Sequence, residues 1–212
     1  FADCSASDRM ESSLRAGVAL YTAGDHHAAH EPWEDVWLDL PDGDDEQLLH
    51  GLIQFTAAIY HARQHNWSGT VGLATQAQSY LDSLPPIHRG IDTEAVTAAL
   101  DRLAADPERV ERESAPPLFY DGRTLTAADL SVDGITTAAD SVAEEYDAYD
   151  TTMIDAAIEY AREEATGPES TYIGLLSTFV DDRDHRGIVY DRIRRHVERR
   201  QSRADDVSGL FD

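Results

Sequence analysis

Apolar residues recur at three- and four-residue intervals along most of the chain, which is the spacing of one face of an α-helix. In residues 11–22, Leu14, Val18 and Tyr21 share such a face, and Gly24 follows where a helix commonly ends. This periodicity predicts a first helix over residues 11–22.

A second helix is predicted from Asp25, a residue type that caps helix N-termini, to Leu40. Pro32 interrupts this pattern because it has no N–H to bond the carbonyl of Ala28. We therefore expect either a kink or a helix that effectively begins near His30.

A third helix, over residues 44–64, carries apolar residues around most of its circumference, so we expect it to be central in the fold. The same periodicity predicts further helices over residues 68–84, 92–105, 135–148, 151–165, 171–182 and 187–203.

Residues 114–131 break the helical pattern. Pro116 and Pro117 precede an Asp121-Gly122 turn, so this segment is expected to be an extended connector or a small hairpin. It divides the chain into a helical core over residues 1–113, the connector over 114–131, and a C-terminal helical extension over 132–212 packed on the core. The predicted fold is an all-α helical bundle with at most one short β-hairpin.

Charge is the most unusual compositional feature. The chain has 41 acidic and 17 basic residues, a net charge of -24, and every basic residue is an arginine. Such a surface repels itself in dilute buffer, whereas molar salt shortens the screening length to about 3 Å. The composition resembles that of halophilic archaeal proteins. It also argues against nucleic acid as a partner, because nucleic acid phosphates are bound by positive surfaces.

Nothing in the pattern indicates a membrane protein, because no window approaches the roughly 18 apolar residues that a spanning helix requires. The first residues carry acids and no basic stretch before an apolar run, so we expect no signal peptide and a cytoplasmic location. The single cysteine, Cys4, has no partner for an internal disulfide and is interpreted as incidental.

Three sequence elements stand out: His-Glu-Pro-Trp-Glu-Asp-Val-Trp at residues 30–37, a His-Gly-Leu-Ile-Gln helix start at 50–54 that continues to His61, and Asn-Trp-Ser-Gly at 66–69. In this order they resemble the Domain of Unknown Function 309 family, which shares an HExWExxW element, a GLIQ-like helix and an Asn-x-x-Gly turn. The resemblance covers about residues 11–84. It implies a compact helical bundle, and it brings neither an established activity nor an assigned site.

Helical geometry places several side chains that can form hydrogen bonds or bind a metal on one face. At 100° per residue, His30, Glu34 and Trp37 share one face of the second helix, with His27 beside them and Glu31 at the edge.

The third helix offers a matching row, because His50, Gln54 and His61 lie within about 40° of one line. If the two helices are antiparallel neighbours, Glu34 comes opposite His50 or Gln54, and His30 comes opposite Ala57 or His61.

Three interpretations of this polar cluster remain open. It can be a buried, mutually satisfied hydrogen-bond network with Trp33 and Trp37 in the core. It can be a pocket for a small polar molecule, with the two tryptophans as aromatic lining. It can also be a metal site, for which His30, Glu34 and His61 are the candidate ligands.

We prefer a non-catalytic binding or scaffold protein that contains the network and needs no cofactor. The alternative is a metal-dependent enzyme, hydrolytic in type, in which a divalent ion is bound and Glu31 acts as the base. His-Glu-x-x-Glu lacks the second histidine of the zincin motif, so a metalloprotease has little support. The sequence leaves enzymatic activity undecided and leaves a homo-oligomer open.

Residues 183–203 depart from the acidic composition, with eight arginines against three acids. Ile188, Val189, Ile193 and Val197 give this segment an apolar stripe as well, so we expect it to pack on the acidic surface of the protein or its oligomer. His26 and His27, near the start of the second helix, are expected to be exposed rather than functional. The other histidines stand apart from any matched set and are assigned no role: His65, His88, His185 and His196.

Overall fold

The computed structural model describes residues 6–164 and 170–208, with side chains as far as residue 203, and these residues are mainly helical. The all-α prediction is confirmed. The α-helices of the described residues are α1 Ala6–Thr22, α2 Glu31–Trp37, α3 Asp44–Arg63, α4 Trp67–Leu81, α5 Thr93–Ala105, α6 Val132–Glu145, α7 Thr151–Glu164, α8 Thr171–Asp181 and α9 Arg186–Ser208. Short 3-10 helices cover Pro107–Glu111, Ala127–Asp129 and Arg183–His185.

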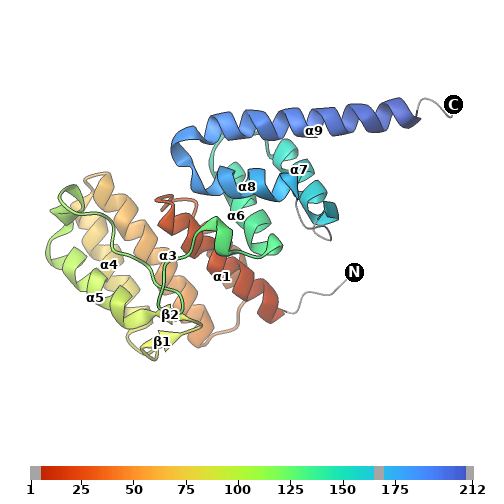
Figure 1. Cartoon of the computed structure of the whole chain (residues 1–212). Coiled ribbons are helices and arrows are strands. Elements are labelled where there is room, and N and C mark those ends of the chain that lie inside the picture. The colour runs from red at the N-terminus through yellow and green to blue at the C-terminus, as the bar shows by residue number, and fades with distance from the viewer. Residues whose placement is uncertain (1–5, 165–169, 209–212) are drawn as a thin grey trace.

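The helices form two packed groups that meet at α1 (Figure 1). On one side α3 packs along α4, and α4 packs along α5. On the other side α6 contacts α7 and α8, and α9 lies across α7 and α8. The first helix of the chain packs against both α2 and α6, so it joins the N-terminal segment to the C-terminal helices.

The second helix is shorter than the sequence pattern suggests. Residues 26–30 form turns, and α2 begins only at Glu31 with His30 as its N-cap residue and Pro32 in its first turn. Proline suits that position because the first helical N–H groups have no intrahelical acceptor. The expected start near His30 is confirmed, whereas Asp25 does not cap the helix, because its carboxylate is used in a buried ion pair with Arg186.

A two-stranded antiparallel hairpin lies between α4 and α5, formed by β1 Ile87–His88 and β2 Ile91–Asp92. The connector at 114–131 forms isolated bridges instead, from Tyr120 to both Ile91 and Arg123. The turn between Tyr120 and Arg123 places Gly122 at φ 76°, a left-handed conformation that glycine adopts without strain. The connector is thereby held against the hairpin.

The core around α2 depends on one tryptophan. Trp33 has no exposed surface, and its Nε1 donates a hydrogen bond to the carbonyl of Leu14 at 3.1 Å. A Cβ on Gly17 would lie 2.3 Å from the Trp33 ring, so α1 can approach this ring only with glycine at that position. Because Trp33 points inward, the neighbouring His30 and Glu34 are left on the partly exposed side of α2.

No helix in the described part of the chain is both long enough and apolar enough to cross a membrane.

Candidate functional site

The first turn of α2 brings three potential metal ligands together. His30 Nε2 lies 3.1 Å from Glu31 Oε1 and 3.9 Å from Glu34 Oε2, and all three ligand atoms lie within 4.8 Å of one another. All three side chains are partly buried. We call these three residues the His30 cluster, and within the described residues no other group of three or more His, Cys, Asp or Glu ligands is this close.

The backbone fixes the tautomer of His30. Its Nδ1 makes a short hydrogen bond to the carbonyl oxygen of His27, and a carbonyl can only accept, so Nδ1 carries the proton. In the neutral ring Nε2 is then an unprotonated acceptor that faces two carboxylates. Three acceptors in contact repel one another unless a proton or a metal cation lies between them. A cation bound between His30 Nε2 and the two carboxylates would relieve this repulsion.

Two further helices reach this end of α2. The His27 ring contacts the His30 ring, with centroids 5.0 Å apart, and also contacts Tyr60 near the end of α3, at 4.8 Å. His27 Nδ1 lies 2.8 Å from a carboxylate oxygen of Glu145 at the end of α6. The His30 cluster therefore lies where α2, α3 and α6 come together.

His50 belongs to a separate site. Its Nδ1 lies 3.4 Å from Glu46 Oε1, which also accepts a hydrogen bond from Trp37 Nε1 at 2.7 Å. The His50 ring packs against Trp37 with centroids 4.6 Å apart and stacks on Tyr80 of α4 at 3.9 Å. Sequence reasoning missed Glu46 and Tyr80, although the four-residue spacing from Glu46 to His50 was a usable signal.

His61 is bound to the turn that follows α3. The amide Nδ2 of Asn66 donates to His61 Nδ1 at 2.7 Å, and Asn66 Oδ1 caps α4 by accepting from the N–H of Gly69 at 3.1 Å. A Cβ on Gly69 would lie 2.7 Å from His61 Nδ1. The Asn-x-x-Gly element therefore has a structural explanation: Asn66 caps α4 and donates to His61, and Gly69 leaves room for the His61 ring.

The expected single network is divided into three parts. The structure brings together His30, Glu31 and Glu34, and within the described residues no hydrogen bond or ion pair joins them to His50, Gln54 or His61. Gln54 Oε1 is buried and has no hydrogen-bond partner there. Of the three metal ligands suggested by the sequence, His30 and Glu34 are adjacent, and Glu31 occupies the place expected for His61.

The prediction that His26 is exposed is wrong. Its ring is 5% exposed and meets Tyr21 edge to face at 4.8 Å. Burial, with the nearby charges of Arg63 and Arg183, lowers the pKa of His26 to about 4. The ring is therefore neutral at pH 7, and its Nε2 is buried without a partner among the described residues.

An acidic cleft of about 400 Å³ lies beside α2, lined mainly from α6 and α7. Its carboxylates have no ion pair or hydrogen bond from a side chain in the described part of the chain: Asp35, Asp140, Glu144, Asp155 and Glu159. Burial, together with the neighbouring charges of Glu144, Asp155 and Asp35, raises the pKa of Asp140 to about 6. Ser13, Arg9 and Arg162 also line the cleft.

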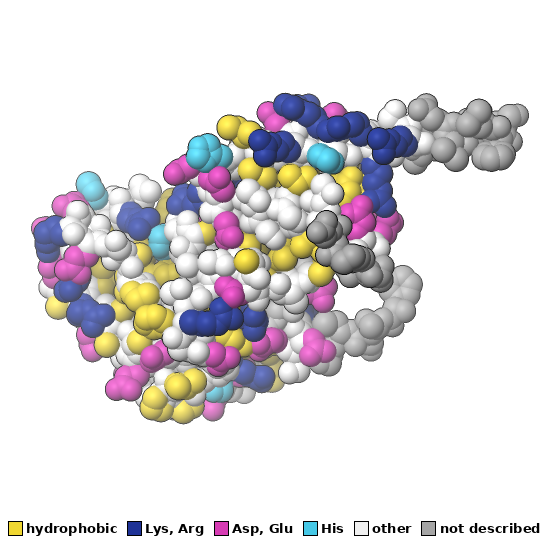
Figure 2. Space-filling model, viewed as in Figure 1, with side chains coloured by type: hydrophobic (Ala, Val, Ile, Leu, Met, Phe, Trp, Pro, Cys, Tyr) yellow, Lys and Arg dark blue, Asp and Glu magenta, His cyan; other side chains and the backbone are white. Residues whose placement is uncertain are grey.

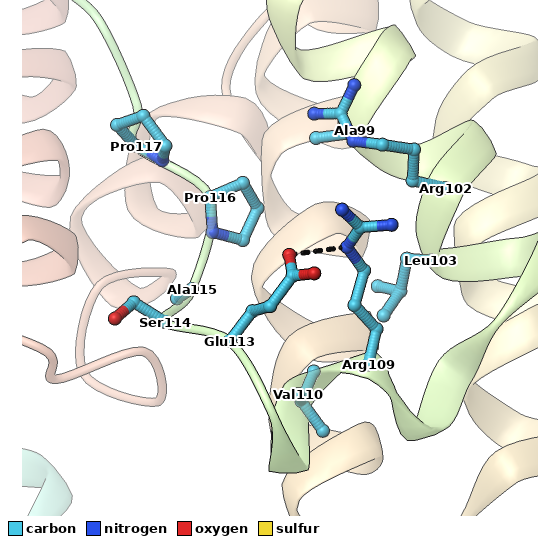
Figure 3. Close-up of a pocket in the computed structure, with 10 residues that line it drawn as sticks. All are labelled: Ala99, Arg102, Leu103, Arg109, Val110, Glu113, Ser114, Ala115, Pro116 and Pro117. Atoms are coloured by element: carbon cyan, nitrogen blue, oxygen red, sulfur yellow. Dashed lines mark hydrogen bonds and ion pairs between the residues drawn. The ribbon is translucent and has the colours of Figure 1, made fainter.

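A larger pocket, of about 580 Å³, lies between α5 and the start of the connector (Figure 3). Leu103, Val110 and Pro116 give it apolar walls, and Arg109 pairs with Glu113 across it at 2.7 Å. None of the residues singled out by the sequence motifs lines it. The pocket therefore contributes nothing to the chemistry of the His30 cluster.

The fold and the cluster define an all-α protein with a partly buried histidine and two glutamates at the start of a short helix. Residues 14–73 match the model of a protein family described as Domain of unknown function (DUF309), which supports placing this part of the chain in that family. The matched segment contains most of α1, all of α2 and α3, and the first half of α4. A comparison with curated proteins returned no match. The family description assigns no activity, so function must be argued from the site.

Proposed function

We propose that this protein is a non-catalytic binding protein that holds a divalent transition-metal ion, such as Zn²⁺, in the His30 cluster. The observation that carries the proposal is the contact of His30 Nε2 with Glu31 and Glu34 while Nδ1 is engaged by the His27 carbonyl. Metal-binding histidines characteristically donate their second ring N–H to a carbonyl or carboxylate, which fixes the ring and leaves the other nitrogen as the ligand.

The spacing of the ligand atoms supports this assignment. Zn²⁺ binds imidazole nitrogen and carboxylate oxygen at about 2.0–2.2 Å, so two ligands of one ion lie about 3–4 Å apart. The 3.1 Å and 3.9 Å separations from His30 Nε2 to the two carboxylates fall in that range. Small rotations of the glutamate side chains would complete the geometry, with water at the remaining position.

The hydrolytic alternative has less support. It needs Glu31 as a general base, but Glu31 Oε1 is the carboxylate oxygen nearest His30 Nε2, which suits a ligand rather than a free base. A protein that binds the ion without turnover is the simpler proposal.

Elemental analysis of protein purified without an affinity tag, followed by Zn²⁺ titration calorimetry of the apo form, tests the proposal. Wild-type protein should bind about one equivalent, and both His30→Ala and Glu34→Gln should abolish binding because each removes a ligand. His185→Ala is the matched control, because His185 Nδ1 also lies 3.0 Å from a carboxylate, that of Asp182, but has no second one.

Two results would refute the proposal. One is an absence of Zn²⁺ binding by the wild type, in which case the His30 cluster is only a structural contact. The other is unchanged binding in the His30→Ala variant, which would place the ion elsewhere.

A further inference from the structure

Four arginines of α9 form one continuous basic face. Arg192, Arg195, Arg199 and Arg203 are exposed and fall within an arc of about 80° around the helix axis, at 100° per residue. None has a carboxylate partner among the described residues, and the Nε of Arg199 donates only to the backbone carbonyl of Arg195. We call this set the arginine stripe; it lies on the α9 edge of the molecule, where basic side chains gather (Figure 2).

Other arginines of the same helix are neutralised. Arg186 pairs with Asp25 at 2.7 Å, and Arg200 reaches Glu164 at 2.8 Å. Arg194 lies 3.1 Å from Asp191 on the same helix. These pairs agree with the expectation that the segment packs on acidic surface of the protein. None of them involves an arginine of the stripe.

No described helix packs over the stripe, although Arg199 and Arg203 also line a hollow beside Tyr172. The buried residues of α9, Val189, Ile193 and Val197, are centred roughly 110° away around the helix. Ile188 falls on the same face as the stripe and is 57% exposed. The face therefore combines four unpaired cations with one exposed apolar side chain, a composition typical of protein interfaces, where arginine is enriched.

The acidic cleft has the complementary properties. It is concave, whereas α9 is a convex rod whose C-terminal part extends beyond α7 and α8 (Figure 1). Within the described residues its five carboxylates form no ion pair or side-chain hydrogen bond, and they outnumber the two arginines of the lining, Arg9 and Arg162. Within one molecule, no ion pair among the described residues joins the arginine stripe to the acidic cleft.

We propose that the arginine stripe of one molecule docks into the acidic cleft of a second copy of this chain. Arg192 to Arg203 spans about 16 Å at 1.5 Å per residue, enough for several arginine–carboxylate pairs side by side. Each molecule offers one stripe and one cleft, so the contact is heterologous and extends head to tail into a chain or a ring.

A second copy fits these observations better than nucleic acid. The net charge of -24 repels a polyphosphate and a second copy of the chain alike, so the choice rests on the composition of the stripe face. Ile188 on the stripe face gives no benefit against phosphates but can be buried against protein.

Complementation between two variants tests this contact. Arg192→Gln/Arg195→Gln removes half of the stripe, and Asp140→Asn/Asp155→Asn neutralises the cleft. By analytical ultracentrifugation at low salt, wild-type protein should self-associate beyond a monomer, and each variant alone should associate at least about tenfold more weakly. An equimolar mixture should form a 1:1 complex that grows no further, because only one intact stripe meets one intact cleft.

Arg194→Gln, which lies off the stripe, is the control and should associate like the wild type; circular dichroism confirms that each variant is folded. A wild type that remains monomeric at about 100 μM, well above the micromolar Kd of a weak specific contact, overturns the proposal. So does a mixture that fails to form the 1:1 complex. Duplex DNA binding by the wild type that is lost in the stripe variant would identify nucleic acid as the occupant instead.

Discussion

The guanidinium of Arg186 donates a hydrogen bond to the carboxylate of Asp25 at 2.7 Å, across 161 residues of chain. Both side chains are almost completely buried. The second carboxylate oxygen accepts from the hydroxyl of Tyr146 at 2.7 Å, and Arg186 also donates to the carbonyls of Phe179 and Val180. The pair is thus satisfied on both sides, and it ties the loop after α1 to the start of α9.

Removing one partner of this pair should destabilise the protein strongly. Arg186→Met leaves the buried Asp25 carboxylate with the Tyr146 hydroxyl and the more distant Arg183, whose Nε lies 3.9 Å away. We therefore expect a loss of about 3 kcal/mol in the free energy of unfolding, the lower end of the range for breaking a buried pair. Urea denaturation measures it. Arg9→Ala, which breaks the exposed pair with Asp39, is the control and should cost less than about 1 kcal/mol. A loss for Arg186→Met as small as that of the control would contradict a structural role for the buried pair.

Two glycine-to-alanine substitutions, in α1 and in α4, test the packing of the core beneath α2. Gly17→Ala should cost about 1–3 kcal/mol, because its Cβ would lie 2.3 Å from the Trp33 ring and 2.7 Å from the backbone oxygen of Ala29. Gly72→Ala, inside α4 with nothing within 4 Å of the new Cβ, should instead be neutral or stabilise by about 0.5–1 kcal/mol. Thermal melts of both variants make the comparison. Equal effects would mean that Trp33 is not packed against α1 as described.

Asp140 should make stability depend on pH. Its pKa is raised to about 6, chiefly by burial and then by the charges of Glu144 and Asp155, so the folded state favours the protonated carboxyl. A raised carboxyl pKa adds stability that is complete below the ordinary value of 3.8 and is lost as the pH rises through 6.

Asp140→Asn imitates the protonated form, so it should raise the melting temperature at pH 8 and have little effect near pH 4. Asp147→Asn, at an exposed position, controls for the loss of one negative charge. A variant with the same melting temperature as the wild type across this pH range would show that Asp140 ionises without penalty.

Much of the fold could be predicted because helical periodicity is a local property. The third helix was expected over residues 44–64 and is found at Asp44–Arg63, since its apolar residues and the following turn lie in one continuous stretch. The start of α2 near His30 followed from the missing N–H of Pro32.

The site was less predictable because it depends on how helices are rotated and offset against each other. Periodicity placed His30 and Glu34 on one face, and they are adjacent. It could not show that α3 presents His50 to Tyr80 of α4, because nothing in the sequence fixes the offset between the two helices. The burial of His26 was missed for the same reason, since it depends on contacts outside its own segment.

Salt should stabilise the fold, if the acidic composition is an adaptation to high salt. Five carboxylates of the acidic cleft form no ion pair among the described residues, so at low ionic strength their mutual repulsion opposes folding. Raising KCl to about 1 M shortens the screening length from roughly 10 Å at 0.1 M to about 3 Å and should raise the melting temperature. Measurements at low protein concentration keep this effect apart from self-association, which salt weakens. In the Asp140→Asn/Asp155→Asn variant the rise should be smaller, because part of the repulsion is already gone. A melting temperature that stays constant or falls with KCl in the wild type would show that the negative charge is no halophilic adaptation.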